Sequence, residues 1–414
     1  MGNIDVIGIG LEGAVGLSEA MQNKIREASL LMGSDRHLGY FPEYGGDRWI
    51  LGDLGKAIDF LKSRMNDDRI VILVSGDPLF FGLGRLLLTE IPAECLTFHP
   101  HFSSIQLAFN RIKIPWQDAR SISVHGRSLD ELTQALQQGI EKIAVLTDGT
   151  NTPTAIAALF LALDLPTGYD IWVCENLGNT EERVICYDAL SLISFPHLTF
   201  APLNVVVFVR RDREEALDLN SLPRFGLPDS SFISFADRPG LMTKREIRLL
   251  ILGELALKDS QTVWDIGAGT GSVSIEIARF CPNSQIYAIE KTAVGVSLIQ
   301  RNCDRFQVNN VKIFQGNAPE SLEQLPTPDR IFIGGSGGNL TGILSVCSHR
   351  LSATGSIVLA VATLEHLAEA LNWVKTQGWY HHLLQVSISR SVPIASLTRF
   401  APLNPVTILT IGNK

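Results

Sequence analysis

Short runs of apolar residues alternate with segments of helical periodicity in the first half of the chain. The pattern predicts strands at 3–9, 28–32, 70–75, 95–98, 120–124, 141–146, 169–174 and 204–209. Helical periodicity lies between them, at 18–27, 54–64, 82–90, 103–110, 128–137 and 153–163. Strands that alternate with helices are typical of parallel or mixed sheets covered by helices. We therefore predict an α/β fold here, made of two halves that meet near Pro115 and Trp116.

The same alternation returns after residue 240. Helical periodicity is found at 243–257, 271–280, 293–305, 339–350 and 363–376. Strand-like runs are found at 262–266, 285–290, 311–315, 329–333, 355–361, 382–389 and 405–411. This order predicts a Rossmann-like, doubly wound sheet, which binds ligands where its strands end. Two α/β domains also fit a length of 414 residues, which exceeds what one core usually serves.

The segment between these two regions has no sustained periodicity. It begins with the charged run Arg210–Glu215, and prolines then interrupt it. We place the domain boundary within 215–228, which predicts a first domain at 1–212 and a second at 225–414.

The stretch from Val263 to Phe280 carries the strongest chemical signal. A buried strand ends at Ile266, and alternating glycines then let the backbone turn sharply and leave room for a ligand. Glu290 ends the next strand, where its carboxylate can accept hydrogen bonds from ribose hydroxyls. A dinucleotide fingerprint needs a third glycine where this chain has Ser272. A cofactor without a pyrophosphate therefore fits this turn better.

With Asp265 directly before the turn, the pattern G-A-G-T-G resembles the first motif of class I S-adenosylmethionine-dependent methyltransferases. The resemblance implies that S-adenosyl-L-methionine is the cofactor of the second domain. The residues expected to contact it are Thr243, Asp265, Gly267, Ala268, Gly269, Thr270, Gly271, Glu290, Asn317 and Ala318.

The first half opens with Gly8-Ile9-Gly10-Leu11-Glu12-Gly13, a G-x-G-x-x-G pattern after a strand. Asp35 follows about twenty residues later, so this pattern taken alone predicts a dinucleotide site. Three later segments favour a different ligand: Ser75–Phe80 after a strand, His99–Gln106 with two serines at a helix start, and Thr147–Thr150.

The order of these segments, with SGDPLFFG as the most specific, resembles the tetrapyrrole methylases, which have the class III methyltransferase fold. In that family the cofactor lies in a cleft between two α/β halves. The resemblance covers essentially all of 1–210. It implies that Gly8 and Gly10 form the turn after the first strand and do not bind a pyrophosphate. The cofactor contacts that it implies are Gly8, Gly10, Asp77, Phe80, Ser103, Ser104 and Thr147.

Together, the two halves resemble the bifunctional precorrin methyltransferases of corrin (cobalamin, vitamin B12) biosynthesis. The segments Met242–Arg248 and Phe332–Gly338 contribute to this resemblance. It implies methylation of a precorrin or cobalt-precorrin at C5 by the first domain and at C15 by the second, with decarboxylation of an acetate side chain. It also implies one S-adenosylmethionine per domain. The family usually has Gly-Asp-Ala where this chain has Gly316-Asn317-Ala318, but asparagine can still accept from an adenine amino group.

This chemistry needs no catalytic triad or metal, because methyl transfer from a sulfonium to an electron-rich ring carbon depends chiefly on alignment and desolvation. The candidate catalytic residues are His125 and Arg127, as anchors for substrate carboxylates, and Thr243 and Lys244, which could close over the second site. A helix-start surface charge remains the alternative for Arg127. The pair His381-His382 is expected on a strand edge or loop rather than at a metal.

The composition of the chain argues against several classes of binding partner. A net charge of −8 without a basic cluster argues against nucleic acid. Six scattered cysteines without a CxxC pair indicate reduced thiols, and the longest apolar run is too short to span a bilayer. We expect a cytoplasmic homo-oligomer that has no nucleic-acid or membrane partner.

Two other functions fit parts of the pattern. An NAD-dependent dehydrogenase would use Gly8, Gly10 and Gly13 for its cofactor. A non-catalytic regulator would bind S-adenosylmethionine in both domains without transferring a methyl group. A comparison of NAD(H) binding with S-adenosylmethionine binding distinguishes the dehydrogenase from a methyltransferase. An assay of methyl transfer distinguishes the regulator from a methyltransferase.

Overall fold

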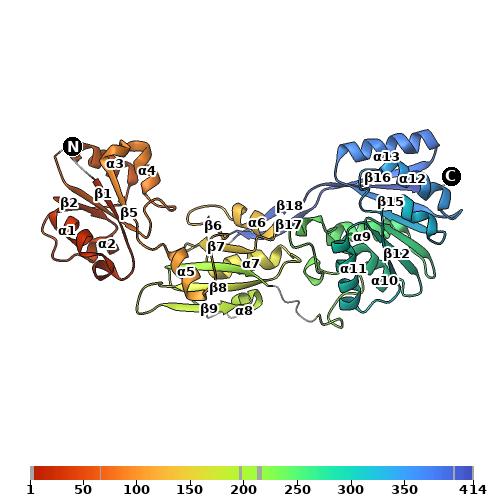
Figure 1. Ribbon diagram of the computed structural model, residues 1–414, viewed down its shortest axis with the longest axis horizontal. Helices are drawn as coiled ribbons and strands as arrows, with labels where there is room; N and C mark the ends of the chain where they lie inside the picture. Colours follow the sequence, from red (N-terminus) through yellow and green to blue (C-terminus); the bar gives the residue numbers. More distant parts are fainter. Residues whose placement is uncertain (1–3, 66, 195–197, 212–216, 395–396, 413–414) are drawn as a thin grey trace. The chain divides into compact units, whose positions relative to one another are not determined.

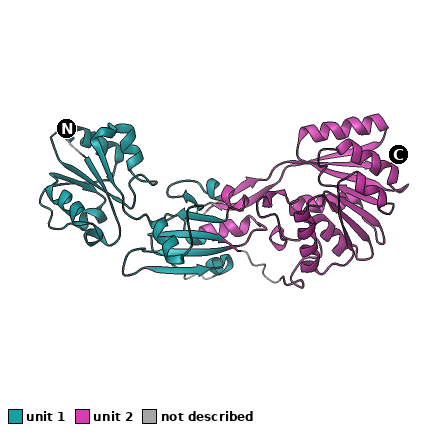
Figure 2. Ribbon diagram, viewed as in Figure 1, with its two compact units in different colours: residues 1–132, 141–154, 170–209 teal, residues 133–140, 155–169, 210–414 magenta. Residues whose placement is uncertain are grey.

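The computed structural model describes residues 4–65, 67–194, 198–211, 217–394 and 397–412. The chain forms two compact units (Figure 2). Unit 1 comprises residues 1–132, 141–154 and 170–209, and unit 2 comprises residues 133–140, 155–169 and 210–414. Residues 212–216, within the charged run and at the edge of the expected boundary, lie outside the described residues, and the limits of the two domains stay a prediction.

The first sheet has the strand order β3-β2-β4-β1-β5, and its strands are parallel (Figure 1). Its strands are β1 (Ile4–Ile9), β2 (Leu30–Gly33), β3 (Asp47–Ile50), β4 (Ile70–Ser75) and β5 (Leu96–His99). The helices of this part are α1 (Glu19–Glu27), α2 (Asp35–Gly39), α3 (Leu54–Arg64) and α4 (Gly84–Glu90). The central strands β1 and β4 are almost wholly apolar and buried, as expected for strands covered on both faces.

The second sheet is mixed, with the order β6-β7-β10-β8-β9. Strands β6 and β7 are parallel, whereas β10 runs antiparallel to β7 and β9 antiparallel to β8. The strands are β6 (Arg120–Ser123), β7 (Lys142–Leu146), β8 (Tyr169–Glu175), β9 (Arg183–Tyr187) and β10 (Asn204–Arg210). The accompanying helices are α5 (Ser104–Ile112), α6 (Asp130–Gln137), α7 (Pro153–Ala162) and α8 (Ala189–Ser194).

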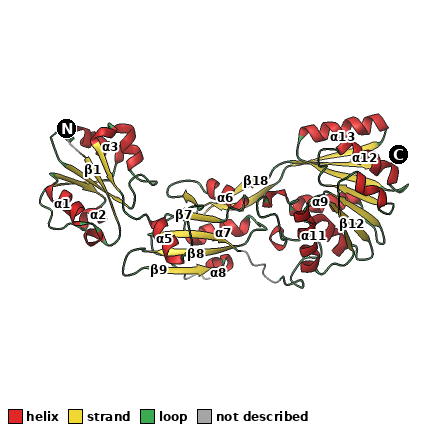
Figure 3. Cartoon of the chain, viewed as in Figure 1, coloured by secondary structure: helices red, strands yellow, loops and turns green. Residues whose placement is uncertain are grey.

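The third sheet has the order β13-β12-β11-β14-β15-β19-β16. The strands from β13 to β15 are parallel to one another, and β19 runs antiparallel to both β15 and β16. The strands of this sheet are β11 (Thr262–Ile266), β12 (Gln285–Glu290), β13 (Val311–Gln315), β14 (Arg330–Ile333), β15 (Ser356–Val361), β16 (Tyr380–Val386) and β19 (Val406–Gly412). Its helices are α9 (Arg245–Leu255), α10 (Ser272–Phe280), α11 (Ala293–Phe306), α12 (Leu340–Arg350) and α13 (Leu364–Gln377). Helices such as α11 and α13 accompany this sheet (Figure 3). The chain order reverses at β11, which has β12 on one side and β14 on the other. Ligands bind at such a reversal in open α/β sheets.

The α/β fold class is confirmed, but the patterns missed six of the α-helices and strands that the structure describes. These are α2, β3, α8, β9 and the separate hairpin of β17 (Ser389–Ile394) and β18 (Leu397–Pro402). Short, exposed strands such as β3 bury too little apolar surface to show a periodic pattern. The strand expected at 382–389 is wrong in its bounds, because β16 ends at Val386 and β17 begins at Ser389. The edge strand β16 carries His381 and His382, as expected.

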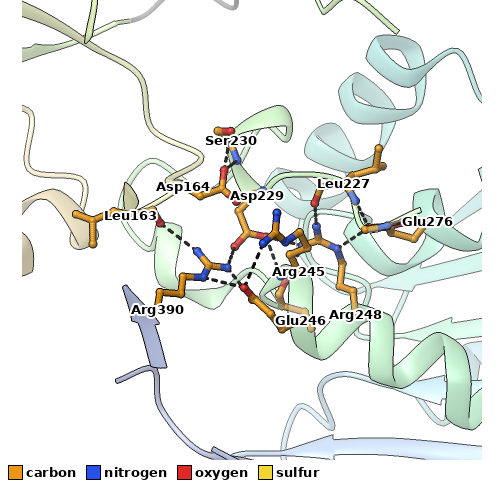
Figure 4. A network of polar contacts seen from close by, with 12 residues as sticks. Leu163, Asp164, Leu227, Asp229, Ser230, Arg245, Glu246, Arg248, Glu276 and Arg390 are labelled. Carbon is orange, nitrogen blue, oxygen red and sulfur yellow. Dashed lines mark hydrogen bonds and ion pairs between the residues drawn. The ribbon is translucent and has the colours of Figure 1, made fainter. Parts of the chain in front are cut away.

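A buried ion network in unit 2 fixes the segment that leads into the third sheet (Figure 4). The Arg248 side chain is fully buried and donates to Asp229 Oδ1 at 2.7 Å, to Glu276 Oε1 at 3.2 Å and to the Thr243 carbonyl at 2.6 Å. Arg390 on β17 donates to Asp229 and to Glu246 on α9. Because a buried charge is costly unless it is paired, this network holds the start of α9, and with it Thr243, in one place.

Candidate functional sites

A cavity of about 510 Å³ opens at the carboxyl ends of β11, β12 and β14 in unit 2. Of the expected cofactor contacts in this half, Gly271 alone does not line it. The expected residues that line it are Thr243, Asp265, Gly267, Ala268, Gly269, Thr270, Glu290, Asn317 and Ala318. Segments that lie up to 75 residues apart in sequence, from Thr243 to Ala318, are therefore gathered around one cavity.

The glycine turn depends on conformations and distances that only glycine tolerates. Gly267 has φ +73°, and a Cβ there would lie 2.6 Å from the carbonyl oxygen of Gly335. Gly271 caps α10 with φ +77°, and its Cβ would lie 3.1 Å from Ile299. Gly271 therefore serves the close packing of α10 against α11 and does not line the cavity. Both positions are strained for any other residue.

Asp265 is 1% exposed and presents one unused oxygen. Its Oδ2 accepts hydrogen bonds from the Ser274 N–H at 3.1 Å and the Ser274 hydroxyl at 2.5 Å. Its Oδ1 has no partner among the described residues. Burial raises the pKa of this carboxyl to about 6, against the effect of the Ser274 donors. A buried, half-satisfied carboxylate that lines a cavity fits a cationic donor, such as the ammonium of an amino acid.

Glu290 is 8% exposed and is already part of the turn. Its Oε2 accepts from the Gly269 N–H at 3.1 Å, and its Oε1 accepts from the N–H and hydroxyl of Thr292 at 2.9 and 2.8 Å. A carboxylate has about four acceptor positions, so these three donors leave capacity for a ligand hydroxyl. The expected ribose acceptor therefore also holds the glycine turn in shape.

Sequence reasoning overlooked several polar residues of this cavity. Arg238, Lys291, Glu320 and Asn339 also line it, and the guanidinium of Arg238 lies 5.4 Å from the ring centre of Phe235. Lys291 directly follows Glu290, which is a signal that could have identified it.

Lys244 does not line this cavity, although the sequence reasoning placed it over the second site. It is the N-cap residue of α9, and its side chain is half-buried beside the ion network. Burial lowers the pKa of its ammonium group, against the charge of Asp229. The glycine loop does contribute, with Gly334, Gly335 and Gly337.

A second cavity, of about 870 Å³, lies in unit 1 and is lined from both of its sheets. The expected cofactor contacts on its wall are Gly10, Asp77, Phe80, Ser103, Ser104 and Thr147, together with the expected anchors His125 and Arg127. Gly8 does not line it. A Cβ at Gly8 would lie 1.9 Å from the Gly76 carbonyl oxygen, so this glycine allows β1 to pass the turn after β4.

The G-x-G-x-x-G segment does not build a pyrophosphate seat. Gly13 begins a single 3-10 turn (Gly13–Gly16), and α1 starts only at Glu19. A Cβ at Gly13 would lie 2.7 Å from the Tyr40 ring, so this glycine is a packing position. A dinucleotide site needs a helix N-terminus at the end of this pattern.

The loop after β7 is held by one carboxylate. Asp148 accepts the N–H groups of Gly126, Thr150 and Asn151 at 2.6–2.7 Å. Although burial opposes it, these backbone donors keep the pKa of Asp148 below its usual value. His125 Nδ1 lies 3.1 Å from the Thr147 carbonyl oxygen. The expected anchors therefore stand on a preorganised loop.

Three of the expected cofactor contacts in this cavity form side-chain hydrogen bonds within the chain. The Ser103 hydroxyl caps α5 by accepting the Gln106 N–H at 3.2 Å. The Thr147 hydroxyl donates to Asn204 Oδ1 at 2.7 Å, and Asp77 Oδ1 accepts the Leu79 N–H at 2.9 Å. These bonds set the shape of the cavity wall, and contact of these side chains with a cofactor stays a prediction.

Among the described residues, no helix combines the length and the apolar character that crossing a membrane requires.

Two family models match the chain. The family described as tetrapyrrole (corrin/porphyrin) methylases matches residues 3–189, and the precorrin methyltransferase domain matches residues 234–413. A relative from Sinorhizobium sp named precorrin-6Y C(5,15)-methyltransferase (decarboxylating) is 33% identical over 98% of this chain and 95% of its own length. One of the same name from Mycobacterium tuberculosis is 30% identical over 99% of this chain and 100% of its own length.

A shorter relative matches only one half. It comes from Pyrobaculum aerophilum, is named probable cobalt-precorrin-6B C(15)-methyltransferase (decarboxylating), and is 38% identical over 45% of this chain and 94% of its own length.

Proposed function

Because the chain belongs to the family of the precorrin-6Y C5,15-methyltransferases (decarboxylating), we propose that it methylates a precorrin at C5 and C15 and removes carbon dioxide from an acetate side chain. The observation that carries this proposal is the presence of two separate cavities, each built on a different methyltransferase-like fold. Each cavity would hold one S-adenosylmethionine, which supplies an activated methyl group when bound.

The cavity of unit 2 fits the polar groups of this cofactor. Asp265 Oδ1, which has no partner within the described residues, would accept from the ammonium group. Glu290 would accept from the ribose, and Asn317 would contact the adenine edge. The backbones of Gly267 and Gly335 approach so closely that a side chain at Gly267 would not fit between them. We assign C15 methylation and decarboxylation to this unit, as the name of the shorter relative suggests.

The chain's own contribution to the chemistry is alignment and exclusion of water. The N–H groups of the 334–338 loop and the ammonium of Lys291 would hold the acetate carboxylate, and the protonated ring would accept the electron pair when the carbon–carbon bond breaks. Thr243 is fixed at the cavity rim by the bond from Arg248 to its carbonyl group.

The cavity of unit 1 would carry out the C5 methylation. Its larger volume and its wall of phenylalanine and leucine side chains suit a flat macrocycle as well as a cofactor. His125 and Arg127 would anchor carboxylates at the edge of the substrate.

The test is mass spectrometry of the products formed from precorrin-6Y, or its cobalt form, with methyl-labelled S-adenosylmethionine. We expect a product that has gained two labelled methyl groups and lost one carbon dioxide. A second readout is calorimetry with S-adenosylhomocysteine, which should give two sites per chain. Binding at two sites without any transfer to either substrate would instead support a regulatory protein.

A further inference from the structure

Arg36 lies on the wall of the unit 1 cavity and has only neutral partners. It belongs to α2, a helix that the sequence pattern did not predict. Its Nη2 donates to the Ser75 hydroxyl at 2.8 Å and lies 3.3 Å from His37 Nε2. Within the described residues, no carboxylate pairs with it. Three N–H groups of the guanidinium remain free to bind a ligand.

His37 supports this arrangement in its neutral form. The ring is 6% exposed, and its Nε2 also lies 3.1 Å from the Ser75 hydroxyl. Burial and the charge of Arg36 lower the pKa of His37 to about 4. Since a guanidinium can only donate, the neutral ring must offer its Nε2 lone pair to Arg36. The guanidinium is thus oriented without being neutralised.

The acidic residues of the cavity form no ion pair with Arg36. Asp148 is occupied by three backbone N–H groups, and Asp77 accepts the N–H of Leu79. Arg127, in the loop after β6 of the second sheet, likewise has no carboxylate partner in the described ranges. The cavity therefore presents two guanidinium groups without a carboxylate partner, one from α2 beside the first sheet and one from the loop after β6 of the second sheet, on a wall that is otherwise rich in apolar side chains.

We propose that Arg36, oriented by His37 and Ser75, binds a peripheral carboxylate of the tetrapyrrole and, with Arg127, fixes the orientation of the macrocycle. This inference rests on the proposed function. Two anchors at separate points of the cavity wall, on α2 and on the loop after β6, define the rotation of a flat ring within its plane, and this rotation decides which ring carbon faces the methyl donor. Arg36 is thus a specificity-determining residue, and His37 is a positioning residue.

The first experiment is Arg36→Gln in the full chain. Mass spectrometry follows the C5 methylation of the precorrin, which we assign to unit 1, at varied substrate concentration. Loss of a charge-assisted hydrogen bond should raise KM for the precorrin at least roughly tenfold. The affinity for S-adenosylhomocysteine and the C15 methylation of the precorrin by unit 2 should stay unchanged. The matched control is Arg69→Gln, which removes an exposed arginine that pairs with Glu27 outside the cavity. This control should change neither the KM for the precorrin nor the affinity for S-adenosylhomocysteine.

The second experiment separates positioning from packing at His37. His37→Leu should raise KM as Arg36→Gln does, and His37→Gln, which keeps an acceptor, should restore most of the affinity. If Arg36→Gln folds poorly, Arg36→Lys decides. It keeps the charge but lacks the planar fork of N–H donors, so its KM for the precorrin should exceed that of the wild type.

The outcomes distinguish the two proposals. Wild-type protein that methylates no precorrin would overturn the proposed function. Normal methylation together with an unchanged KM in Arg36→Gln, or in Arg36→Lys where that variant decides, would overturn the role of Arg36 alone. A loss confined to S-adenosylhomocysteine affinity would also overturn it, because Arg36 would then bind the carboxylate of the cofactor.

Discussion

The two cavities use different means to prepare a binding site. In unit 2, the short stretch from Asp265 to Glu290 supplies both buried carboxylates of the wall. Its glycine turn has three positive φ angles, Glu290 accepts the N–H of Gly269 in that turn, and Asp265 accepts the N–H of Ser274 just after it. In unit 1, the wall is assembled from segments between Ile9 and Val205, and neutral groups hold charged ones in place. The first design fixes a small polar ligand through local backbone geometry. The second surrounds a larger ligand and depends on how two sheets present their ends.

The largest expected difference in cofactor binding between the two units comes from the substitution Gly267→Val. Its side chain would collide with the backbone of Gly335, and its φ of +73° disfavours a branched residue. We expect no measurable S-adenosylhomocysteine binding in unit 2 and normal binding in unit 1, measured by calorimetry. The control is Gly269→Ala, which has φ +57° but has no atom closer than 3.9 Å to the added methyl group. If both variants bind equally well, close approach in the turn does not matter.

The second prediction concerns the independence of the two halves. A cut within 215–228 should give two working enzymes, but Leu217, Leu219 and Leu222 pack against the core of the third sheet and Leu227 is fully buried. A fragment that starts at residue 217 should therefore be more stable than one that starts at 229, by about 3 kcal/mol or more, because the shorter one loses Leu227 and two N–H donors to Glu276. Thermal unfolding measures the difference.

Activity of the fragments tests the same point. The piece from 217 should add one methyl group at C15 and release carbon dioxide, and the complementary N-terminal piece should add one at C5. Two folded fragments that act only after they are recombined would contradict this.

Glu290→Ala should weaken cofactor binding in unit 2 by roughly tenfold to a hundredfold and leave unit 1 unaffected. Since the carboxylate also accepts from Gly269 and Thr292, Glu290→Gln is the sharper variant. It keeps the size and one acceptor oxygen, so its binding should lie between those of the wild type and Glu290→Ala. Equal affinity in all three proteins would mean that Glu290 only shapes the turn.

The smallest effect is a pH dependence confined to unit 2. The pKa of Asp265 is raised to about 6 by burial, so its charged form costs stability in the ligand-free protein. That carboxyl favours the fold at low pH, and the contribution is lost as pH rises through about 6. A cationic ligand binds the charged form, so affinity in unit 2 should fall up to about tenfold per pH unit below 6. Calorimetry between pH 5 and 8 tests this, and Asp265→Asn should remove the dependence.

In unit 1 the carboxylate of Asp148 should not titrate in that window, because backbone donors hold its pKa below the usual value. A matching pH dependence in both units would point away from Asp265.

The sequence by itself determined the α/β class, the order of most strands and helices, and the residues around the glycine turn of unit 2. These features are local. A buried strand, its glycines and the acid at the end of the next strand lie within 26 residues, from Asp265 to Glu290, and adjacent parallel strands bring their ends together. His125 and Arg127, which follow the strand expected at 120–124 and were proposed as anchors, both line the cavity of unit 1.

Only the tertiary structure decided which charges are left free and which are neutralised. The sequence analysis selected Lys244, which lies beside a buried ion network, and passed over Lys291, which lies on a cavity wall. Arg36 has an acid directly before it in sequence, yet its side chain meets His37 and Ser75 instead. The physical reason is that the protonation and availability of a side chain depend on burial and on partners from other strands, and those are set when distant segments pack together.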